Sequence, residues 1–443
     1  MDDSSLLLTS RQTGEEWMRL DVAAVLKRFF FLEQALVLAS AGWIPALRRL
    51  GSKATFAELA WQDALTADAL RERVFELKYP SRLLEVAEDE PLVAVFRAAL
   101  HAPSAVGVAE VMASLFVPML RDAYQRYLQV SDALADGPTH RILSIAVRDK
   151  EEQIRALRAL LEGEPASAVE REAGRRWRAE LERLLTAVGG VWPGQVRAGV
   201  EVPRVVGPGR EFRLAQDPGR DDAYFLCRFY WPDIIDQAYP YGEGLALQLR
   251  SAISHLNEVW AVDTAGAILQ ALAEPLGWEF VRDAARWLYD ESRHMTMGKR
   301  RLEEWGLPSS EIPLGTYIYE AARGQEPIYR LGMLGYFETK NIGKKQERAR
   351  SFGVMGDRRS QQDMDFDWAD ETLHAEYGRR WLRRLLEKEG RPEEDWQAVL
   401  ARCEQLVREE VGTATAEERM IIRAVADRLL ERARQLAIAA GAA

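Results

Sequence analysis

Apolar positions recur every three to four residues along most of the chain, which is the spacing of an amphipathic α-helix. Alternating patterns typical of strands are scarce, and the helix-favouring residues Ala, Leu, Arg and Glu dominate. The pattern predicts an all-α protein with four or five helices in its first part, four long helices after them and two at the end. Their expected bounds are 22–47, 55–77, 104–135, 139–163 and 168–188, then 243–272, 278–305, 327–351 and 361–388, and finally 393–411 and 416–439.

Proline and glycine interrupt this pattern between residues 191 and 225, where they include Pro193, Gly194, Pro208 and Gly209. Helices do not tolerate such a density of both residues. We therefore expect a linker, with a small hairpin as an option, between two helical bundles. The expected divisions are an N-terminal helical bundle at 1–190, the linker at 191–225, a second bundle at 226–388 and a helical extension at 389–443.

The composition fits an ordinary globular protein of two to four domains. Of the 443 residues, 47% are hydrophobic and 29% are charged, which excludes general disorder. The formal net charge is 59 − 69 = −10, which argues against nucleic acid as a partner.

The sequence gives little indication of a cysteine-based site, a secretory signal or a membrane span. Cys227 and Cys403 cannot form a disulfide framework or a four-cysteine zinc site, which favours a reducing compartment. The acidic N-terminus carries only a three-leucine apolar run and does not match a secretory signal. The stretch closest to a membrane span, at 105–120, is too short and contains Glu110. We expect a cytoplasmic protein without a membrane span.

Two of the five histidines lie in the same local pattern. Residues 290–294 read DESRH and residues 370–374 read DETLH, so a His follows a Glu by three positions in both. Positions i and i+3 share one face of a helix. Glu291 with His294, and Glu371 with His374, would therefore each present a carboxylate and an imidazole together, which is half of a chelate.

A single glutamate precedes each of these pairs at the same distance. Glu258 stands 291 − 258 = 33 residues before the first pair, and Glu338 stands 371 − 338 = 33 residues before the second. In two antiparallel helices this spacing places both sites at a similar height, about 21 to 22 Å from the turn at ~1.5 Å per residue. The surrounding positions on these faces are apolar or small, so the carboxylates would be buried and would need a metal or protons to neutralise them.

This arrangement resembles the ferritin-like di-iron carboxylate proteins, in which two helices each provide a Glu and two others each provide a Glu-x-x-His. The resemblance covers about residues 243–388 and implies a ferritin-like four-helix bundle that holds two metal ions. The cofactor it implies is a pair of iron ions (Fe2+/Fe3+), and a mixed Mn/Fe pair is compatible with the same ligands. The implied metal ligands and catalytic residues are Glu258, Glu291, His294, Glu338, Glu371 and His374.

The aspartate before each paired glutamate extends the resemblance. Oxygen-activating members share the motif D-E-x-R-H, in which the Asp binds the metal-bound His of the opposite helix. Carried over, Asp370 would support His294, and Asp290 would support His374. The first copy matches the motif in full, including Arg293.

Other positions near the expected site are less specific. The second copy has Leu373 in place of the motif's arginine, which weakens the expected support on that side. His255 precedes the first single glutamate by three residues, and we expect a buried hydrogen-bonding histidine. Asn341 lies one turn after Glu338, near where some relatives with peroxidase activity have an additional Glu. A peroxidase is therefore slightly disfavoured. Nearby aromatic residues would line a substrate pocket, form an electron path or pack in the core: Trp260, Tyr289, Tyr336 and Phe337.

The first bundle carries part of the same pattern without the histidines. Glu33 lies in a comparable helix, but the position 33 residues later is Thr66. We interpret this part as a ferritin-like bundle that has lost its metal, or else as an unrelated helical bundle, used for dimerisation, partner docking or capping. The acidic residues that could occupy its second hairpin are Glu110, Asp149, Glu151 and Glu152.

The resemblance implies a di-iron oxidoreductase that uses O2 to hydroxylate, N-oxygenate, desaturate or oxidatively cleave an organic substrate. The expected partners are O2, an unidentified small molecule and an external electron donor, because no CxxC motif offers a rubredoxin-type iron site. A homodimer is compatible, whereas nucleic acid and membrane are not expected. Two alternatives remain: a ferroxidase, iron-handling or peroxide-protective protein, and a non-catalytic scaffold stabilised by metal.

Overall fold

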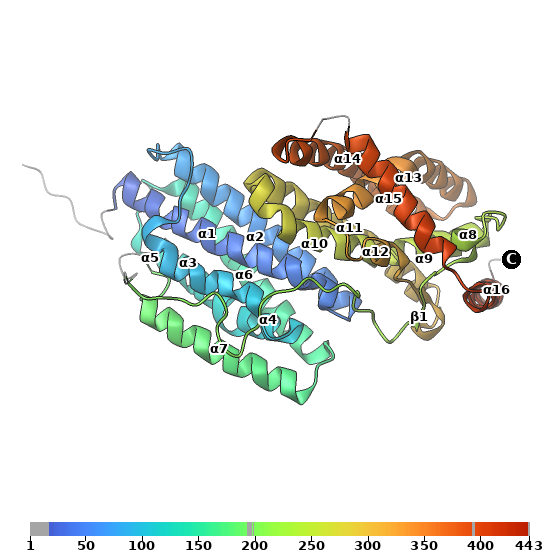
Figure 1. Cartoon of the computed structure of the whole chain (residues 1–443), viewed down its shortest axis with the longest axis horizontal. Helices are drawn as coiled ribbons and strands as arrows, with labels where there is room; N and C mark the ends of the chain where they lie inside the picture. Colours follow the sequence, from blue (N-terminus) through green and yellow to red (C-terminus); the bar gives the residue numbers. More distant parts are fainter. Residues whose placement is uncertain (1–16, 193–196, 198, 392–394, 442–443) are drawn as a thin grey trace, which may run out of the picture.

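The computed structural model describes residues 17–192, 197, 199–391 and 395–441, and it confirms the all-α class (Figure 1). In the described residues, strand structure is limited to β1 (Phe225–Leu226) and β2 (Pro313–Leu314), which pair in parallel. The hairpin expected between 191 and 225 is therefore wrong for the described part of that segment. Pro193, Gly194 and the acidic N-terminus lie outside the described residues. No helix in the described ranges is both long and apolar enough to cross a membrane.

The first half of the chain forms seven α-helices among the described residues. Helix α1 packs along α2, α5 along α6, and α4 along α7, while α2 also contacts α6. These helices are α1 (Arg19–Trp43), α2 (Leu50–Glu76), α3 (Glu90–Arg97), α4 (Ala105–Val111), α5 (Val117–Val130), α6 (Gly137–Gly163) and α7 (Ala168–Val188).

The single helix expected at 104–135 is wrong. A π-helical segment, Met112–Phe116, separates α4 from α5, and α5 ends at Val130. Pro118 lies two residues after this segment, at the second position of α5. Because proline has no backbone N–H and its ring crowds the carbonyl one turn earlier, a wider turn relieves the regular α-helical pattern there.

The second half contains four long helical arms that lie side by side. Helices α9 and α10 both pack against α11, α13 packs against α14, and contacts of α10 with α13 and of α11 with α14 close the group. The helices are α8 (Pro232–Ile235), α9 (Leu245–Leu256), α10 (Val259–Leu276), α11 (Trp278–Glu304), α12 (Tyr317–Ala321), α13 (Pro327–Met355), α14 (Arg358–Lys388), α15 (Asp395–Gly412) and α16 (Ala416–Ala439). Glu393, the expected first residue of the helix at 393–411, lies outside the described residues.

The helix expected at 243–272 is broken in its middle. Helix α9 ends at Leu256 and α10 begins at Val259. Between them, Asn257 donates from Nδ2 to the carbonyl of Pro313 at 3.0 Å and accepts at Oδ1 from the backbone N–H of Gly315 at 2.7 Å. These bonds satisfy the backbone of the segment that contains β2, and they place Glu258 at a turn rather than within a continuous helix.

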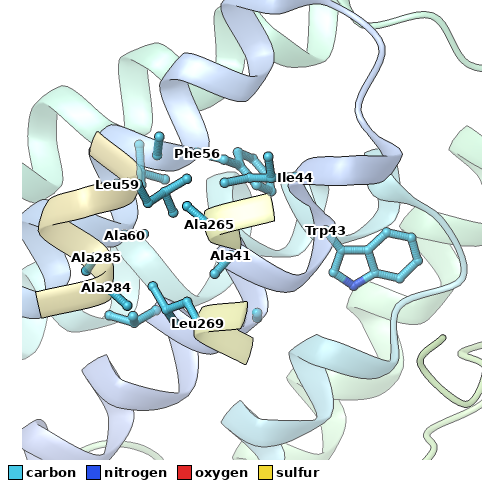
Figure 2. Close-up of a cluster of buried hydrophobic side chains, with 14 of the residues drawn as sticks. Ala41, Trp43, Ile44, Phe56, Leu59, Ala60, Ala265, Leu269, Ala284 and Ala285 are labelled. Atoms are coloured by element: carbon cyan, nitrogen blue, oxygen red, sulfur yellow. The ribbon is translucent and has the colours of Figure 1, made fainter. Parts of the chain in front are cut away.

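The two halves share one hydrophobic core. Helices α1 and α2 pack against α10 and α11, and Figure 2 shows the small and branched side chains that meet there. The labelled residues from the first half are Ala41, Trp43, Ile44, Phe56, Leu59 and Ala60; those from the second half are Ala265, Leu269, Ala284 and Ala285. This packing helps to bury most residues of α10.

Three buried charges also join the halves. Lys53 of α2 donates from Nζ to Asp263 of α10 at 2.6 Å, and Arg220 donates from Nη1 to the other oxygen of Asp263 at 2.7 Å. Burial lowers the pKa of Lys53 to about 8. One carboxylate thus neutralises two cations from segments far apart in the chain.

Replacing Asp263 by Ala would leave both cations buried without their anion. We expect a loss of about 3–5 kcal/mol in the free energy of unfolding, which is the usual cost of breaking a buried ion pair. Urea unfolding measures this loss. The matched control is Asp222→Ala, which removes an exposed partner of Arg48 and Arg49 and should cost about 1 kcal/mol or less. Equal stability of the two variants would contradict this role.

Candidate metal centre

All six candidate ligands converge in the interior of the second half. Helix α11 positions Glu291 and His294, and α14 positions Glu371 and His374. The two remaining glutamates are Glu338 on α13 and Glu258 at the break between α9 and α10. Five of the six are buried, and the Glu258 side chain is 14% exposed.

These residues form two clusters with one shared member. Within each cluster, one ligand atom from every residue lies within 4.8 Å of the others. Among the described residues, no other group of three or more such side chains is close enough to hold an ion. The first cluster is Glu258, His294, Asp367 and Glu371; the second is Glu291, Glu338, Glu371 and His374.

Asp367 was missed by the sequence analysis. It lies one turn before Glu371 on α14, with one oxygen 3.5 Å from Nδ1 of His294 and the other 2.7 Å from Nε2 of His255. The spacing Asp-x-x-x-Glu puts both carboxylates on one helix face. That spacing is common in a charged helix, so on its own it does not single out Asp367.

A lysine that the sequence did not indicate also enters the site. Lys345 of α13 is buried, with Nζ 2.7 Å from Asp367 and 3.4 Å from Glu258, and it contacts Glu371. Burial alone would lower its pKa, but Asp367 and Glu258 raise it. Its charge completes the balance of the two clusters. Five carboxylates carry −5, and one ammonium with two divalent ions would carry +5.

Several buried atoms at the centre of the clusters have no hydrogen-bond partner in the described structure. They are Nδ1 of His294, Nδ1 of His374, Oε2 of Glu258 and Oε2 of Glu371. Buried polar atoms in folded proteins are almost always paired. Ligand atoms about 2.0–2.2 Å from one ion lie roughly 3.0–3.5 Å apart, and Nδ1 of His294 lies 3.5 Å from Oε2 of Glu258. The residues therefore fit a pair of metal ions.

The electrostatics of the clusters also match a cation site. Burial raises the pKa of Glu371 well above its usual value, and nearby Glu291 adds to the shift. Burial disfavours the charged form of His374, but Asp290 and Glu291 outweigh it and raise the pKa to about 9. Burial opposes ionisation of Glu291 too, but His294 and His374 lower its pKa to about 2. These opposed shifts arise because several buried carboxylates and imidazoles share one site, whose charge bound cations would balance.

A layer of aspartates orients the two histidines. Nε2 of His294 lies 3.3 Å from Asp370, and Nε2 of His374 lies 3.3 Å from Asp290. Both cross-helix contacts implied by the resemblance are present. Because each aspartate engages Nε2, the Nδ1 atom of each imidazole faces its cluster, which suits metal ligation.

Arginines of α11 hold both aspartates. Arg293 donates from Nη1 to Asp290 at 2.7 Å and to Asp370 at 2.9 Å. Arg286 donates to Asp290 at 2.6 Å and reaches Asp370 at 3.4 Å. The departure from the motif at Leu373 leaves neither aspartate without an arginine, because Arg293 and Arg286 of α11 each contact both of them. Arg286 lies one turn before Asp290, outside the motif, which is why the sequence analysis missed it.

His255 lies behind Asp367 and is not in either cluster. Its Nδ1 accepts from Arg301 at 2.6 Å, so Nε2 carries the proton and donates to Asp367 at 2.7 Å. Burial lowers the pKa of His255 and favours this neutral form. His255 therefore positions Asp367, in line with the expected hydrogen-bonding role.

A cavity of about 220 Å³ adjoins the clusters. The rings of Trp260 and Phe337, 5.1 Å apart, line it together with Asn341, whereas Tyr289 and Tyr336 do not. A small molecule in this cavity would touch both carboxylate ligands and aromatic rings. The candidate ligands whose carboxylates line it are Glu258, Glu291, Glu338 and Glu371, and Asp233 is a fifth carboxylate of the lining.

The first half contains a buried cluster of charged side chains around a lysine. Nζ of Lys150 on α6 lies 2.7 Å from Glu33 of α1 and 2.7 Å from Asp63 of α2, and Tyr124 donates to Glu33 at 2.6 Å. All four side chains are buried, and burial raises the pKa of Glu33 to about 7. The ammonium group of Lys150 thus neutralises the two buried carboxylates.

Glu33 lies in this cluster as expected, but the other acidic residues expected beside it do not bind Lys150. The second carboxylate is Asp63, one turn before Thr66, and Lys150 follows the expected Asp149. Glu110 instead faces Arg178 at 3.5 Å. The other two expected residues, Glu151 and Glu152, are exposed.

Replacing Lys150 by Met would leave two buried carboxylates without a cation. We expect a loss of about 3–5 kcal/mol in unfolding free energy, with the metal content of the second half unchanged. Thermal unfolding and metal analysis of one preparation measure both quantities. Lys299→Met is the control, because Lys299 pairs with Glu303 at the surface. A stable Lys150→Met protein would contradict the ion-pair role.

The comparisons with known proteins leave the activity open. A family model described as "Protein of unknown function (DUF455)" matches residues 242–419. The match covers all residues of both clusters and the four long helical arms. No curated protein and no solved structure matches the chain.

Proposed function

We propose that this protein is a di-iron oxidoreductase that activates O2 to oxidise a small organic substrate. In this proposal α9 with α10, α11, α13 and α14 form a ferritin-like four-helix bundle around the metal pair. The observation that carries the proposal is the pair of clusters that share Glu371 and line a cavity.

Each cluster would hold one ion, and Glu371 would bridge the two. Two iron ions held this way would supply the two-electron reduction of O2 that drives oxidation of a substrate, and a Mn/Fe pair is compatible. The first cluster has three carboxylates and the second also has three, each with one imidazole. Lys345 would offset the additional charge that Asp367 brings to the first cluster.

The remaining side chains would keep this geometry fixed. Asp370 and Asp290 hold the two imidazoles, and the arginines of α11 hold the aspartates. Trp287 donates from Nε1 to Glu291 at 3.0 Å and stacks on His374, with ring centres 5.3 Å apart. Such contacts restrict a ligand to one orientation and exclude water from it. Electrons would come from an external donor, since Cys227 and Cys403 are free cysteines at separate positions.

The cavity favours substrate oxidation over iron handling. The lining of the cavity combines the rings of Trp260 and Phe337 with polar and charged side chains. A small organic molecule would use both kinds of surface, whereas a route for iron has no need of aromatic rings.

Anaerobic loading with ferrous iron, followed by O2, tests the proposal. We expect about two iron ions per chain and an O2-dependent near-ultraviolet absorption that requires both ions. Iron oxidation should stop near two equivalents. Continued oxidation of added iron would instead support the ferroxidase alternative. Bound metal without any reaction with O2 would support the scaffold alternative.

A further inference from the structure

When the four carboxylates assigned to metal are set aside, the lining of the cavity beside the clusters has more basic than acidic side chains. Apart from the carboxylates assigned to metal, its lining contains one acid, Asp233. Lys345 is already paired with Asp367. His255, also in the lining, accepts at Nδ1 from Arg301 at 2.6 Å and lies 2.7 Å from Asp367 at Nε2. The basic side chains of the lining are Arg250, Lys344, Lys345 and Arg348.

Two buried donors of the lining have no acceptor. Arg250, 5% exposed, binds Asp233 through Nε and Nη2 at 3.1–3.2 Å, but its Nη1 atom is buried and has no partner in the described structure. The hydroxyl of Tyr241 is buried and unpartnered in the same way. A buried donor without an acceptor is rare in a folded protein. Both residues line the cavity, so an acceptor on a bound molecule could satisfy them.

A second arginine adds to this charge. The guanidinium groups of Arg250 and Arg348 lie 4.8 Å and 4.1 Å from the centre of the Tyr241 ring. Arg348 has no ion pair among the described residues, and Asp233 is the only carboxylate that binds Arg250. Two arginines on one tyrosine ring with a single counter-charge would be stabilised by an added anion.

We propose that the substrate of this site is a small organic carboxylate. Its carboxylate accepts hydrogen bonds from Nη1 of Arg250 and from the hydroxyl of Tyr241, and Arg348 adds a second positive charge. Its apolar body packs against the rings of Trp260 and Phe337, beside the metal ligands. A neutral analogue would leave the two donors unpaired and would bind less tightly. The inference rests on the proposed function for the reaction, whereas binding itself requires only the cavity.

Calorimetry on the full-length chain as purified, with its metal content measured, tests this inference. The probes are acetate, benzoate and 3-phenylpropionate, each compared with its amide. We expect at least one carboxylate to bind about tenfold or more tightly than its amide. Tyr241→Phe and Arg348→Met should each reduce the affinity for that carboxylate by about five- to twentyfold and leave the affinity for the amide unchanged.

The two variants should fold normally, because the Tyr241 hydroxyl has no protein partner and Arg348 has no ion pair. Arg350→Met is the matched control, since Arg350 is an exposed residue of the same helix and does not line the cavity. Equal binding of acids and amides, no binding of any carboxylate, or full affinity in both variants would overturn the inference. If the protein reacts with O2 but shows no preference for carboxylates in calorimetry, only this inference is contradicted. If it prefers carboxylates but binds no iron, only the proposed function is contradicted.

Discussion

Glu371→Ala is expected to abolish stoichiometric binding of both metal ions. Glu371 is the one residue common to the two clusters, and its unpartnered Oε2 atom is buried between them. Removing it would take one ligand from each ion and leave the other carboxylates without a shared bridge. Glu338→Ala removes a ligand from the second cluster alone, so it should retain about one ion per chain.

Metal analysis after loading with ferrous iron measures this difference. Glu376→Ala is the matched control, because Glu376 is an exposed glutamate of the same helix. It should bind two ions like the unaltered protein. Two ions per chain in Glu371→Ala would show that the shared carboxylate does not bind metal.

Gly298→Ala is expected to disrupt the site from a position one turn after His294 on the same face of α11. A Cβ at this position would lie 2.2 Å from the backbone nitrogen of Leu256 and 2.6 Å from the carbonyl oxygen of Ala252. Both atoms belong to α9, so neither can move without moving that helix. The end of α9 carries His255 and leads directly into Glu258. Forcing the helices apart would therefore displace a candidate ligand and the support of Asp367.

We expect Gly298→Ala to lose about 1–3 kcal/mol or more of stability, which is typical of overpacking. The first cluster should lose its ion while the second keeps its own. Gly343→Ala is the control, since a Cβ there meets nothing within 4 Å. That change should stabilise its helix slightly. A Gly298→Ala protein with unchanged stability and two bound ions would contradict the close approach of α9 and α11.

The sequence predicted the positions that obey a repeated helical spacing. The six candidate ligands could be found because a single Glu and a Glu-x-x-His recur at equal separation. The break at Asn257 could not be found, because its cause is a pair of hydrogen bonds to Pro313 and Gly315, more than fifty residues later. The helix propensity of the neighbouring residues gives no information about a contact so distant in sequence. The π-helical segment before Pro118 could be predicted in part, since a proline indicates that the helix is disturbed but not which form the disturbance takes.

Charged residues of the interior were the hardest to predict. Asp367 and Lys345 lie on helices rich in charge, where an inward-facing residue looks the same as a solvent-facing one. Only the packing of the surrounding helices shows that these two residues face inward. In the first half, the 33-residue spacing was applied to Glu33, but the true partner is Asp63, one turn earlier. The buried cation there is Lys150, whose role depends on helices distant in sequence.

Diffraction from crystals of the iron-loaded protein, recorded at the iron absorption edge, tests the central claim most directly. The account predicts two anomalous peaks per chain, about 3.5–4 Å apart as in other two-metal sites. One peak should lie between His294 and Glu258, the other between His374 and Glu338, with Glu371 between them. A single peak, or peaks elsewhere on the protein with none at these clusters, would contradict the di-metal centre.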